Sequence, residues 1–554
     1  MAESIRIYCK NTMSYFEAPI GSSLSEIYKL CGSPLDYRPM HAQVNNKTEG
    51  LNYRCWMSKD VEFVDCTQSS GMRTYVRSLS FIFSKAVHDI LPDATFNLEH
   101  SVSNGYYCVI HNCNINEDIV ARIKEQMKKL IKADLPFKQK YIRTEEAIKM
   151  FSKQGMDDKS ILLETVGMAY TPYYELDGYE NYFYGCLTPS TGYINIFDIE
   201  PYFEGLLLRV PDQNNPGVLA KFIRQDKMFN VFKEHLKLLK ALDLENVGDL
   251  NKAIREGRTA DLIMISEAMQ EKQVAKIAEE IANRYDDGVR IVLISGPSSS
   301  GKTTFCKRLQ IQLATNFLRP IGLSLDDYFV NREDTPKDEN GDYDFESLYS
   351  LDLPTLNNDL KRLLSGEEIE IPTFDFNLGK RVYKGNKLKM EKNAVLVIEG
   401  IHALNPELTS FIDDKYKYKV YVSVLTSISL DNHNRIPTTD NRLLRRIIRD
   451  FRFRGYSAED TIRRWPSVRR GEDKWIFPYQ ENADAMFNSA MLYELAALRK
   501  YAEPILSEVK ECEDENAEAY RLLRFLRYFN YIQDSSLPGT SLLREFLGGG
   551  TFKY

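Results

Sequence analysis

The sequence predicts a multidomain protein that joins α+β regions to an α/β domain built on a parallel sheet. Its 554 residues exceed the size of one ordinary domain, so we expect several. Residues 287–510 alternate continuous apolar strands with helices, which is typical of a parallel sheet covered by helices on both faces. Residues 1–66 alternate short apolar runs with turn residues, which indicates a small β-rich domain with one helix.

The composition excludes several classes of protein. Apolar residues make up 43% and charged residues 27% of the chain, so disorder is not expected as its main state. The 72 basic and 79 acidic side chains leave a net charge of −7, which argues against a protein that coats nucleic acid.

Neither a membrane nor an oxidising compartment is expected. No apolar run approaches the roughly 18–20 residues that span a bilayer, and the first residues do not resemble a secretory signal. The nine cysteines form no C-x-x-C pair. This pattern favours reduced thiols in the cytoplasm over a disulfide framework or a zinc ribbon.

The first two regions, residues 1–66 and 67–211, combine short strands with amphipathic helices. In the first region we expect strands Ser4–Tyr8, Tyr15–Pro19, His41–Asn45 and Val61–Asp65 and helix Ser25–Cys31. In the second we expect helices Arg73–Leu91, Asn116–Asp134 and Thr144–Gln154 and strands Gly105–Ile110 and Tyr193–Ile199. Thr144 is the expected N-cap of its helix.

Residues 212–286 are predicted to be helical, as Leu219–Leu242, Val247–Glu256 and Ile263–Tyr285. This connector is either a plain linker or a layer that packs on both neighbours. In residues 287–510 we expect strands Arg290–Ser295, Ile321–Leu325, Ala394–Glu399 and Lys419–Val424 and helices Thr303–Asn316 and Leu353–Ser365. Residues 511–554 form a helical extension with a glycine-rich end.

A phosphate-binding loop is the strongest motif. Residues 296–304, GPSSSGKTT, match G-x-x-x-x-G-K-[ST], follow an apolar strand and open a helix, which a simple Gly/Ser turn does not require. Such a loop turns backbone N–H groups onto phosphates at a helix N-terminus. Lys302 would reach the β- and γ-phosphates, and Thr303 would offer its hydroxyl to Mg²⁺. The expected nucleotide contacts are Gly296, Ser298, Ser299, Ser300, Gly301, Lys302, Thr303 and Thr304.

Two acids follow two other strands of the same predicted sheet. Asp326 comes after Ile321–Leu325, and Glu399 ends Ala394–Glu399. Both would lie at the carboxyl edge of the parallel sheet, where ligands bind. A single acid at such a place is often a helix cap, but two of them beside a complete phosphate loop indicate proton transfer or Mg²⁺ binding.

Further motifs accompany the loop in a fixed order: LSLDDYF, YDFESLYSLD, IPTFDFNLGKR, VLVIEGIHAL and DNRLLRRIIRDFRFRG. Together they resemble the uridine kinase/phosphoribulokinase family, and uridine kinase most of all, over residues 289–500. The resemblance implies an enzyme that uses ATP and Mg²⁺. It also implies that Asp326 is the base for a nucleoside 5′-hydroxyl, that Asp344 binds the ribose, that Phe374 stacks near the base, and that Glu399 helps to place Mg²⁺.

One departure from the family concerns the base. Uridine kinases carry a histidine a few residues after the P-x-[YF]-D-F segment, and they use it on the pyrimidine. Here Phe376 is followed by Asn377-Leu378-Gly379, with Gly379 at the histidine's place. The resemblance therefore implies a nucleoside kinase more strongly than it implies a pyrimidine.

Ten arginines lie between residues 442 and 470. The resemblance places the family's lid here, which closes on the triphosphate and neutralises its charge. Arg442, Arg446 and Arg449 are the lid candidates, and Arg454 is assigned to the substrate. A solvated basic face and a nucleic-acid surface are the two alternatives.

The front half resembles a different family. Residues 1–66 look like the ubiquitin-like β-grasp (TGS) domain of threonyl-tRNA synthetases. Residues 67–211 resemble the editing domain that follows it there, most clearly in YVRSLSFIFSKAVHDILPDATFNLEHSVSNGYYCVI, EEAIKMF and YGCLTPSTGYINIFDI. The family's two helix histidines correspond to Arg77 and Phe81, and Cys186 alone of the metal-binding residues remains.

One thiol does not hold zinc, so editing chemistry is expected to be lost. His88, His100 and His111 are then interpreted as ordinary structural residues.

The sequence therefore predicts an ATP-dependent kinase that phosphorylates the 5′-hydroxyl of a nucleoside. Uridine and cytidine are the nucleosides expected as substrates. One alternative keeps the fold and changes the acceptor to another nucleoside or a sugar. The other is a nucleotide-regulated, translation-associated protein that binds RNA through residues 1–211, against which the acidic net charge argues. Relatives of the kinase family are often oligomeric, so a homo-oligomer is an expectation of the resemblance.

Overall fold

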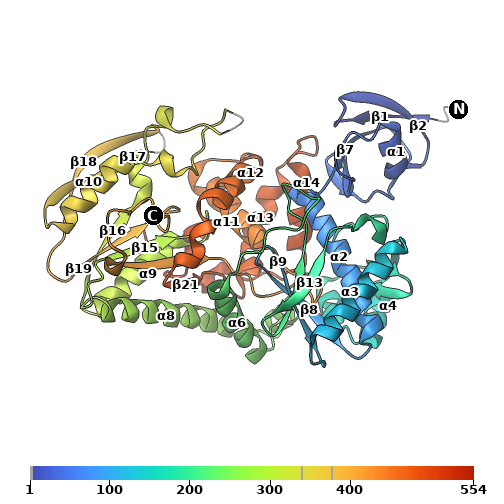
Figure 1. Cartoon of the computed structure of the whole chain (residues 1–554), viewed down its shortest axis with the longest axis horizontal. Helices are drawn as coiled ribbons and strands as arrows, with labels where there is room; N and C mark the ends of the chain where they lie inside the picture. Colours follow the sequence, from blue (N-terminus) through green and yellow to red (C-terminus); the bar gives the residue numbers. More distant parts are fainter. Residues whose placement is uncertain (1–3, 339–340, 376–377, 554) are drawn as a thin grey trace.

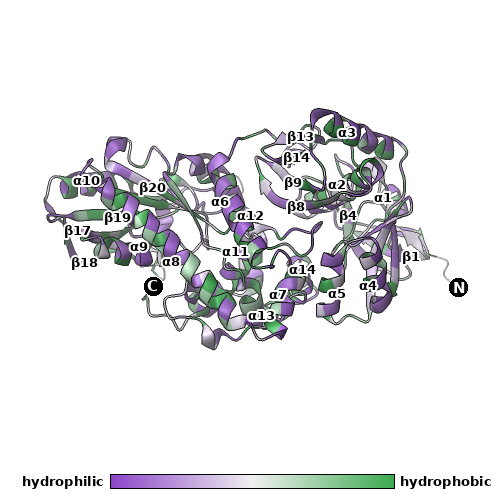
Figure 2. Cartoon of the chain, turned by 90° about the horizontal axis from the view of Figure 1, so that it is seen from below, coloured by the Kyte–Doolittle hydropathy of each residue, from purple (hydrophilic) through white to green (hydrophobic). Residues whose placement is uncertain are grey.

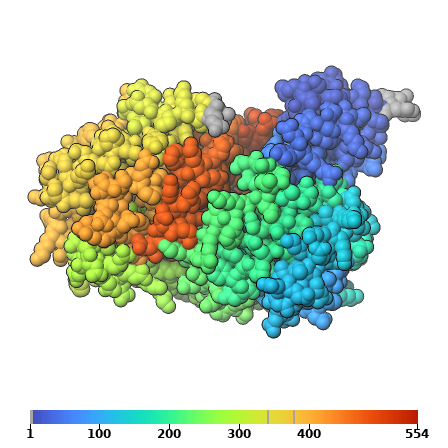
Figure 3. All heavy atoms as spheres, in the orientation of Figure 1, coloured from blue at the N-terminus to red at the C-terminus, as the bar shows by residue number. Residues whose placement is uncertain are grey.

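The computed structural model describes residues 4–338, 341–375 and 378–553. Figure 1 shows an elongated molecule that carries the sheet of the phosphate loop at one end and two N-terminal units at the other. The C-terminal helices lie between the two ends, where Figure 3 shows them as red spheres. No helix among these residues combines the length and apolarity needed to cross a membrane.

The first unit is a five-stranded sheet in the order β2-β1-β7-β4-β5. Alternating residues of β1 and β7, such as Ile7 and Val61, are fully buried, because one face of the sheet packs on a core. A capping box between Ser23 and Glu26 starts helix α1. The elements are β1 Ser4–Cys9, β2 Ser14–Pro19, β3 Ser22–Ser23, α1 Leu24–Leu30, β4 His41–Val44, β5 Lys47–Glu49, β6 Arg54–Cys55 and β7 Lys59–Val64.

The second unit is built on helix α2, whose middle turns are almost entirely buried. α2 packs on α3 and on the sheet β13-β14-β9-β8, and a smaller sheet, β10-β11-β12, packs on α4. The elements are α2 Ser69–Ile90, β8 Thr95–Val102, β9 Gly105–His111, α3 Glu117–Lys132, β10 Lys138–Arg143, α4 Thr144–Lys153, α5 Asp157–Val166, β11 Tyr170–Leu176, β12 Tyr179–Asn181, β13 Asp198–Tyr202 and β14 Gly205–Arg209.

The connector packs on both neighbours, which decides between the two alternatives left open by the sequence. Its helices are α6 Asp226–Ala241, α7 Val247–Arg255 and α8 Thr259–Asn283. α7 contacts α5 of the second unit, and α8 contacts the helix of the phosphate loop. In Figure 2 hydrophobic and hydrophilic residues alternate along α8, as expected for a helix with one buried face.

The phosphate-loop domain has a parallel five-stranded sheet in the order β16-β19-β15-β20-β21. Strand β15 lies in the centre and is buried at every residue. The elements are β15 Ile291–Ser295, α9 Lys302–Thr315, β16 Arg319–Ser324, α10 Leu353–Leu364, hairpin strands β17 Glu368–Asp375 and β18 Lys380–Lys389, β19 Ala394–Glu399, β20 Lys417–Ser423, α11 Thr438–Arg449, α12 Ala458–Trp475, β21 Ala485–Asn488 and α13 Glu494–Ser507.

The C-terminal extension contains α14 Asn516–Leu526 and the short helix α15 Arg544–Leu547. α14 packs on α12 and α13 and also contacts β5 of the first unit. α15 packs on α11. Glu545 of α15 contacts Thr304, so this last helix lies next to the phosphate loop.

Three sequence-based expectations about elements are wrong in detail. Thr144 lies inside α4 rather than at its cap, and its hydroxyl pairs with that of Thr171. The strand expected over Tyr193–Ile199 starts only at Asp198, because a 3₁₀ turn, Thr191–Tyr193, comes first. The helix expected from Leu219 begins at Asp226, since Leu219 makes a β-bridge with Pro211.

Candidate active site

The phosphate loop connects the central strand β15 to α9. Gly296 is required there because a Cβ at this position would lie 2.1 Å from the carbonyl oxygen of Val422. Ser299 and Gly301 have positive φ angles, 59° and 84°. Left-handed residues of this kind turn successive backbone N–H groups toward one concave, anion-binding side.

Lys302 and Thr303 begin α9 and point toward the two predicted acids. The Lys302 amine donates to the carbonyl of Pro297 at 3.1 Å. The Thr303 hydroxyl donates to Oε1 of Glu399 at 3.3 Å. Strands β16 and β19 pair so that Ser324 lies opposite Glu399, and Asp326 follows β16 directly. The structure therefore brings both acids to the edge of the sheet that holds the loop.

The charges of these groups are strongly coupled. Burial, and after it the charge of Asp326, raise the pKa of Glu399 to about 7, while Lys302 opposes the shift. The surrounding protein also raises the pKa of Asp326, although its side chain keeps an exposed surface. Burial lowers the pKa of Lys302, against the attraction of four carboxylates. Divalent cations relieve this kind of crowding among carboxylates.

Glu346 is a carboxylate at this site that the sequence did not single out. Its Oε2 atom is buried and has no hydrogen-bond partner among the described residues. Burial raises its pKa to about 7, while Arg446 and Lys302 oppose the shift. Glu346 packs on Gly471 of α12, where a Cβ would lie 2.3 Å from the glutamate Cβ.

Asp344, the residue that the resemblance assigned to ribose, turns onto its own loop. Its Oδ1 atom accepts a hydrogen bond from the backbone of Glu346 at 3.2 Å. The two carboxylates therefore have different surroundings. Asp344 stabilises the turn of its own loop, and Glu346 lies close to the charges of Lys302 and Asp326. The motif YDFESLYSLD marks this loop, but the resemblance identified Asp344 alone.

His402 and Trp475 lie beside the segment that follows Glu346, since the Trp475 ring is 5.8 Å from that of Tyr349. The ring centroids of His402 and Trp475 are 6.5 Å apart, and burial lowers the pKa of His402 to about 4, so the imidazole is neutral near pH 7. The indole nitrogen of Trp475 is buried without a partner in the described part of the chain. Buried polar atoms are nearly always hydrogen-bonded, so these atoms point to a polar ligand or to water.

Phe374 and Gly379 lie in the β17–β18 hairpin. The Phe374 ring is 5.6 Å from that of Phe329, and its backbone donates to Asp327. Gly379 is buried with φ of 64°, and a Cβ there would lie 2.9 Å from the side chain of Arg332. Arg332 thus occupies the space that a side chain at position 379 would need. Phe376 and Asn377 lie outside the described residues.

Arg442 does not fit the predicted lid role in this structure. Its guanidinium is almost fully buried, pairs with Glu472 and donates to the carbonyl of Ser298. Glu472 in turn accepts from the backbone N–H of Ser298 at 3.0 Å. Arg442 and Glu472 therefore support the backbone of the phosphate loop at Ser298, and we call this buried ion pair the brace of the loop. Arg445, the next arginine on the helix, is buried against Glu494.

The other three predicted arginines lie nearer the surface. Arg446 donates to the hydroxyl of Ser298 at 2.9 Å and pairs with Asp450. Arg449 also pairs with Asp450, and burial lowers its pKa to about 10, so it remains charged. Arg454 is exposed and lies 3.4 Å from Asp450. All three share one carboxylate, which holds the ends of these side chains together.

The C-terminal helix α15 places an acid on the phosphate loop. Oε2 of Glu545 accepts hydrogen bonds from the Thr304 backbone N–H at 3.2 Å and from the Thr304 hydroxyl at 2.6 Å. The side chain of Leu542 lies 2.7 Å from the position that a Cβ on Gly301 would take. No sequence motif signals these contacts, because they join residues about 240 positions apart.

The second unit brings together Arg77 and Cys186, two of the positions that the resemblance matched to an editing site. Cys186 accepts from the Arg77 guanidinium through its carbonyl, and its thiol lies 3.6 Å from the Thr74 hydroxyl. The buried His41 also contacts Thr74, at 3.1 Å. Phe81 packs in an aromatic cluster with Phe137 instead. No metal-binding group of three ligands is found here among the described residues.

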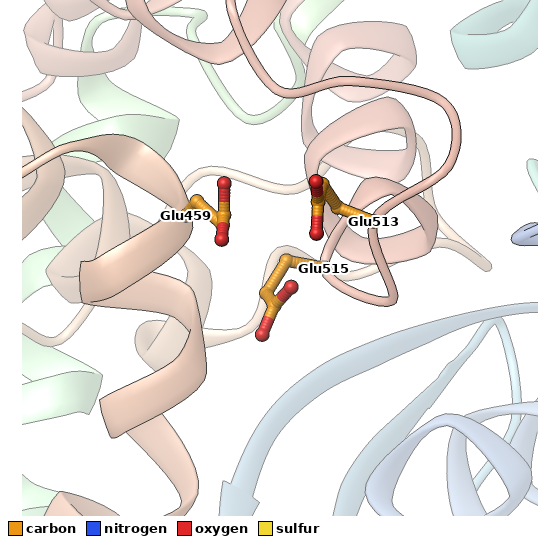
Figure 4. Close-up of side chains that lie close together, drawn as sticks. All are labelled: Glu459, Glu513 and Glu515. Atoms are coloured by element: carbon orange, nitrogen blue, oxygen red, sulfur yellow. The ribbon is translucent and has the colours of Figure 1, made fainter.

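A separate group of three acids lies near α12 and the start of α14. Figure 4 shows Glu459, Glu513 and Glu515 facing one another. Arg463 forms ion pairs with Glu459 and Glu515. Because this arginine bridges two of the three carboxylates, the cluster is a local ion-pair network.

Comparisons with known proteins agree with this geometry. Residues 291–495 match the model of the phosphoribulokinase/uridine kinase family. The uridine kinase of Halobacterium salinarum is 30% identical over 194 residues, which cover 34% of this chain and 76% of that protein. The chain belongs to the phosphoribulokinase/uridine kinase family. This membership supports a kinase-type phosphotransferase and leaves the acceptor open.

Two other relatives match only in part. Inorganic pyrophosphatase TTM2 of Arabidopsis thaliana is 29% identical over 185 residues, and the match covers 33% of this chain and 23% of that protein. The N-terminal part is similar to the threonine–tRNA ligase of Desulforamulus reducens, with 24% identity over 249 residues. That match covers 42% of this chain and 38% of the ligase.

Proposed function

We propose that this family member is an ATP-dependent kinase that transfers the γ-phosphate to the 5′-hydroxyl of a nucleoside, with uridine and cytidine as the first candidates. The observation that carries the proposal is the meeting of Lys302, Thr303, Asp326 and Glu399 at one edge of the parallel sheet. This is the arrangement that positions a triphosphate and a hydroxyl nucleophile for transfer.

The loop would hold the triphosphate, and Lys302 would support the phosphoryl group in transfer. The hydroxyl of Thr303 and the carboxylates of Glu399 and Asp326 are hard oxygen donors, so they fit Mg²⁺. Bound there, Mg²⁺ neutralises phosphate charge. Arg446 and Arg449 lie on the neighbouring face of α11 and are the arginines best placed to close over the phosphates.

Asp326 would take the proton of the attacking hydroxyl. Its side chain is accessible, follows β16 at the sheet edge that holds the loop, and can accept a proton from a hydroxyl group there. Burial raises its pKa, and the neighbouring Lys302 opposes this shift.

The acceptor would lie beside Glu346, His402 and Trp475. This wall offers a carboxyl group, a neutral imidazole and an indole N–H, which suits an uncharged acceptor with several hydroxyl groups. Asp344 would position the ribose by stabilising the loop beside it. Phe374, in the hairpin, and Arg454, after the end of α11, would lie on either side of the acceptor. Because Arg332 fills the space beside Gly379, another nucleoside or a sugar is the alternative acceptor.

A second candidate function is a nucleotide-regulated protein that binds RNA through residues 1–211. The partial similarity to threonine–tRNA ligase favours it. We propose that residues 1–66 are a TGS-like β-grasp domain and that the editing-like unit has lost deacylase chemistry, since Cys186 belongs to no group of three metal-binding side chains among the described residues. Salt-dependent tRNA binding at physiological ionic strength would support this function, and its absence would remove it.

The experiment that tests the kinase proposal is ADP release from ATP and Mg²⁺ against a panel of nucleosides, sugars and sugar phosphates. Turnover with uridine or cytidine is expected. Turnover only with another uncharged acceptor would keep the chemistry and correct the substrate. If no acceptor stimulates ADP release, the kinase proposal fails.

A further inference from the structure

The C-terminal segment lies against the phosphate loop and presents Glu545 to it. Both hydrogen bonds of the Glu545 carboxylate go to Thr304, one to the backbone N–H and one to the hydroxyl. Leu542 covers Gly301 from the same side. The segment also packs on α11, the helix that carries Arg446 and Arg449.

The donors that Glu545 uses are those that a phosphate would use. Thr304 is the third residue of α9, where the backbone N–H groups point out of the N-terminal end of the helix. Such N–H groups at a helix N-terminus bind anions, and in phosphate loops they bind the nucleotide. One set of donors cannot serve the Glu545 carboxylate and a phosphate oxygen at the same time. Glu545 also adds a negative charge close to Lys302 and Glu399.

The segment that carries Glu545 is firmly held. Leu542, Leu543, Phe546 and Leu547 are all buried. Arg544 donates to the carbonyls of Asp534 and Leu537, which ties the turn before α15 together. The acid is therefore presented in a fixed direction rather than carried on a loose tail.

The same extension is anchored on the N-terminal units. Lys10 pairs with Asp514, and Lys47 pairs with Glu511. Arg73 of α2 pairs with Glu518, which also pairs with Arg521. Arg521 in turn pairs with Asp440, in the first turn of α11. The extension thus touches the front half, the arginine helix and the phosphate loop.

We propose that Glu545 is an internal competitor of the nucleotide: it occupies the Thr304 donors of the phosphate loop and must leave them before a triphosphate binds. This autoinhibitory contact rests on the proposed assignment of residues 296–304 as the phosphate site. It predicts that the free enzyme binds ATP more weakly than its loop allows.

The test measures the Kd of a fluorescent ATP analogue with Mg²⁺ and no acceptor. The proteins are the full-length chain, Glu545→Ala, Glu545→Gln and the control Glu508→Gln, which makes the same chemical change at an exposed residue of the C-terminal region. Removing a charged hydrogen-bonding competitor is expected to tighten binding by roughly tenfold or more in Glu545→Ala. The Gln variant should show a smaller gain, since its amide oxygen still accepts from Thr304, and the control should match the wild type.

Unchanged or weaker binding by Glu545→Ala, in a protein whose circular dichroism and melting match the wild type, overturns the proposal while ATP binding itself stands. If neither protein binds the analogue, the phosphate-site assignment fails and the proposal fails with it. Hydrogen exchange gives an independent readout. Saturating nucleotide should increase exchange in residues 541–548 of the wild type, and unchanged exchange there would contradict the proposal.

Discussion

Lys302 is surrounded by carboxylates from four elements, which lie on β19, after β16, in the loop of Glu346 and on α15. Among the described residues, its amine donates to a backbone carbonyl of its own loop, that of Pro297. The Lys302 ammonium group is therefore positioned to bind an anion and is not committed to one carboxylate. This arrangement is expected of the lysine that supports a phosphoryl group in transfer.

We expect Lys302→Ala to lower kcat by at least about 100-fold, because it removes a preorganised charge from the transition state. Steady-state kinetics with the best acceptor measure the effect. The matched control is Lys307→Ala, which removes a lysine from the same helix but outside the loop. Full activity of Lys302→Ala would show that transfer occurs elsewhere.

The raised pKa of Glu346 predicts a stability that depends on pH. The folded protein holds the proton of this carboxyl up to about pH 7, whereas an unfolded glutamate releases it at about pH 4.3. The stability that this group contributes is thus complete below the unfolded pKa and is lost as the pH rises through about 7.

Glu346→Gln should therefore lose less stability than the wild type between pH 5 and pH 8. The difference is expected to be about 1–2 kcal/mol, since the residue keeps some exposure. Denaturant unfolding without ligands at both pH values measures it. Parallel pH profiles for the two proteins would show that Glu346 is already ionised below pH 5.

At the scale of elements, α11 and α12 hold the phosphate loop from behind. Arg442 of α11 and Glu472 of α12 form a buried ion pair, and both contact Ser298. Arginines that look like a lid in the sequence are thus split by their position on α11, with some buried against the loop and others near its surface.

We expect Glu472→Gln to destabilise the protein by about 3 kcal/mol or more, because it leaves the Arg442 charge buried without a counterion. Its affinity for ATP should fall as well, since the loop loses its brace. Asp473→Asn is the neighbouring control, with a side chain that is 63% exposed. Equal melting temperatures for Glu472→Gln and the control would contradict the brace.

Four strands and two helices of the phosphate-loop domain were predictable, because each strand is a short apolar run and each helix follows a clear start signal. The hairpin β17–β18, strand β21 and helices α11, α12 and α13 were not predicted as elements. Ala394–Glu399 is observed with the bounds predicted, and the loop and its two acids meet at the expected edge. Glu346 and Glu545 were not predictable, since their roles depend on contacts between residues far apart in sequence. The strand expected at Tyr193–Ile199 failed because a local turn overrides its aromatic and β-branched composition.

At the scale of the whole molecule, the front half and the phosphate-loop domain share buried contacts. Lys159 of α5 and Asp431 form an ion pair at 2.7 Å, and both side chains are completely buried. Asp431 also accepts from the backbone of His433 and Asn434. This buried ion pair therefore joins α5 of the second unit to the phosphate-loop domain.

Asp431→Asn should lower the stability by about 3 kcal/mol, because the Lys159 charge then stays buried without compensation. Differential scanning calorimetry should show a clear fall in melting temperature. Glu391→Gln, which breaks the exposed pair with Arg319, should change it little. A small effect of Asp431→Asn would mean that the two parts are not joined through this pair.

The most direct test of the central claim is the acceptor-dependent transfer of phosphate from labelled ATP by the wild type and by Asp326→Asn. The wild type should give a phosphorylated nucleoside or other hydroxyl acceptor, and Asp326→Asn should bind ATP and lose this product by at least about 100-fold. If Asp326→Asn forms the product at the rate of the wild type, Asp326 is not the base and the proposed active site is wrong.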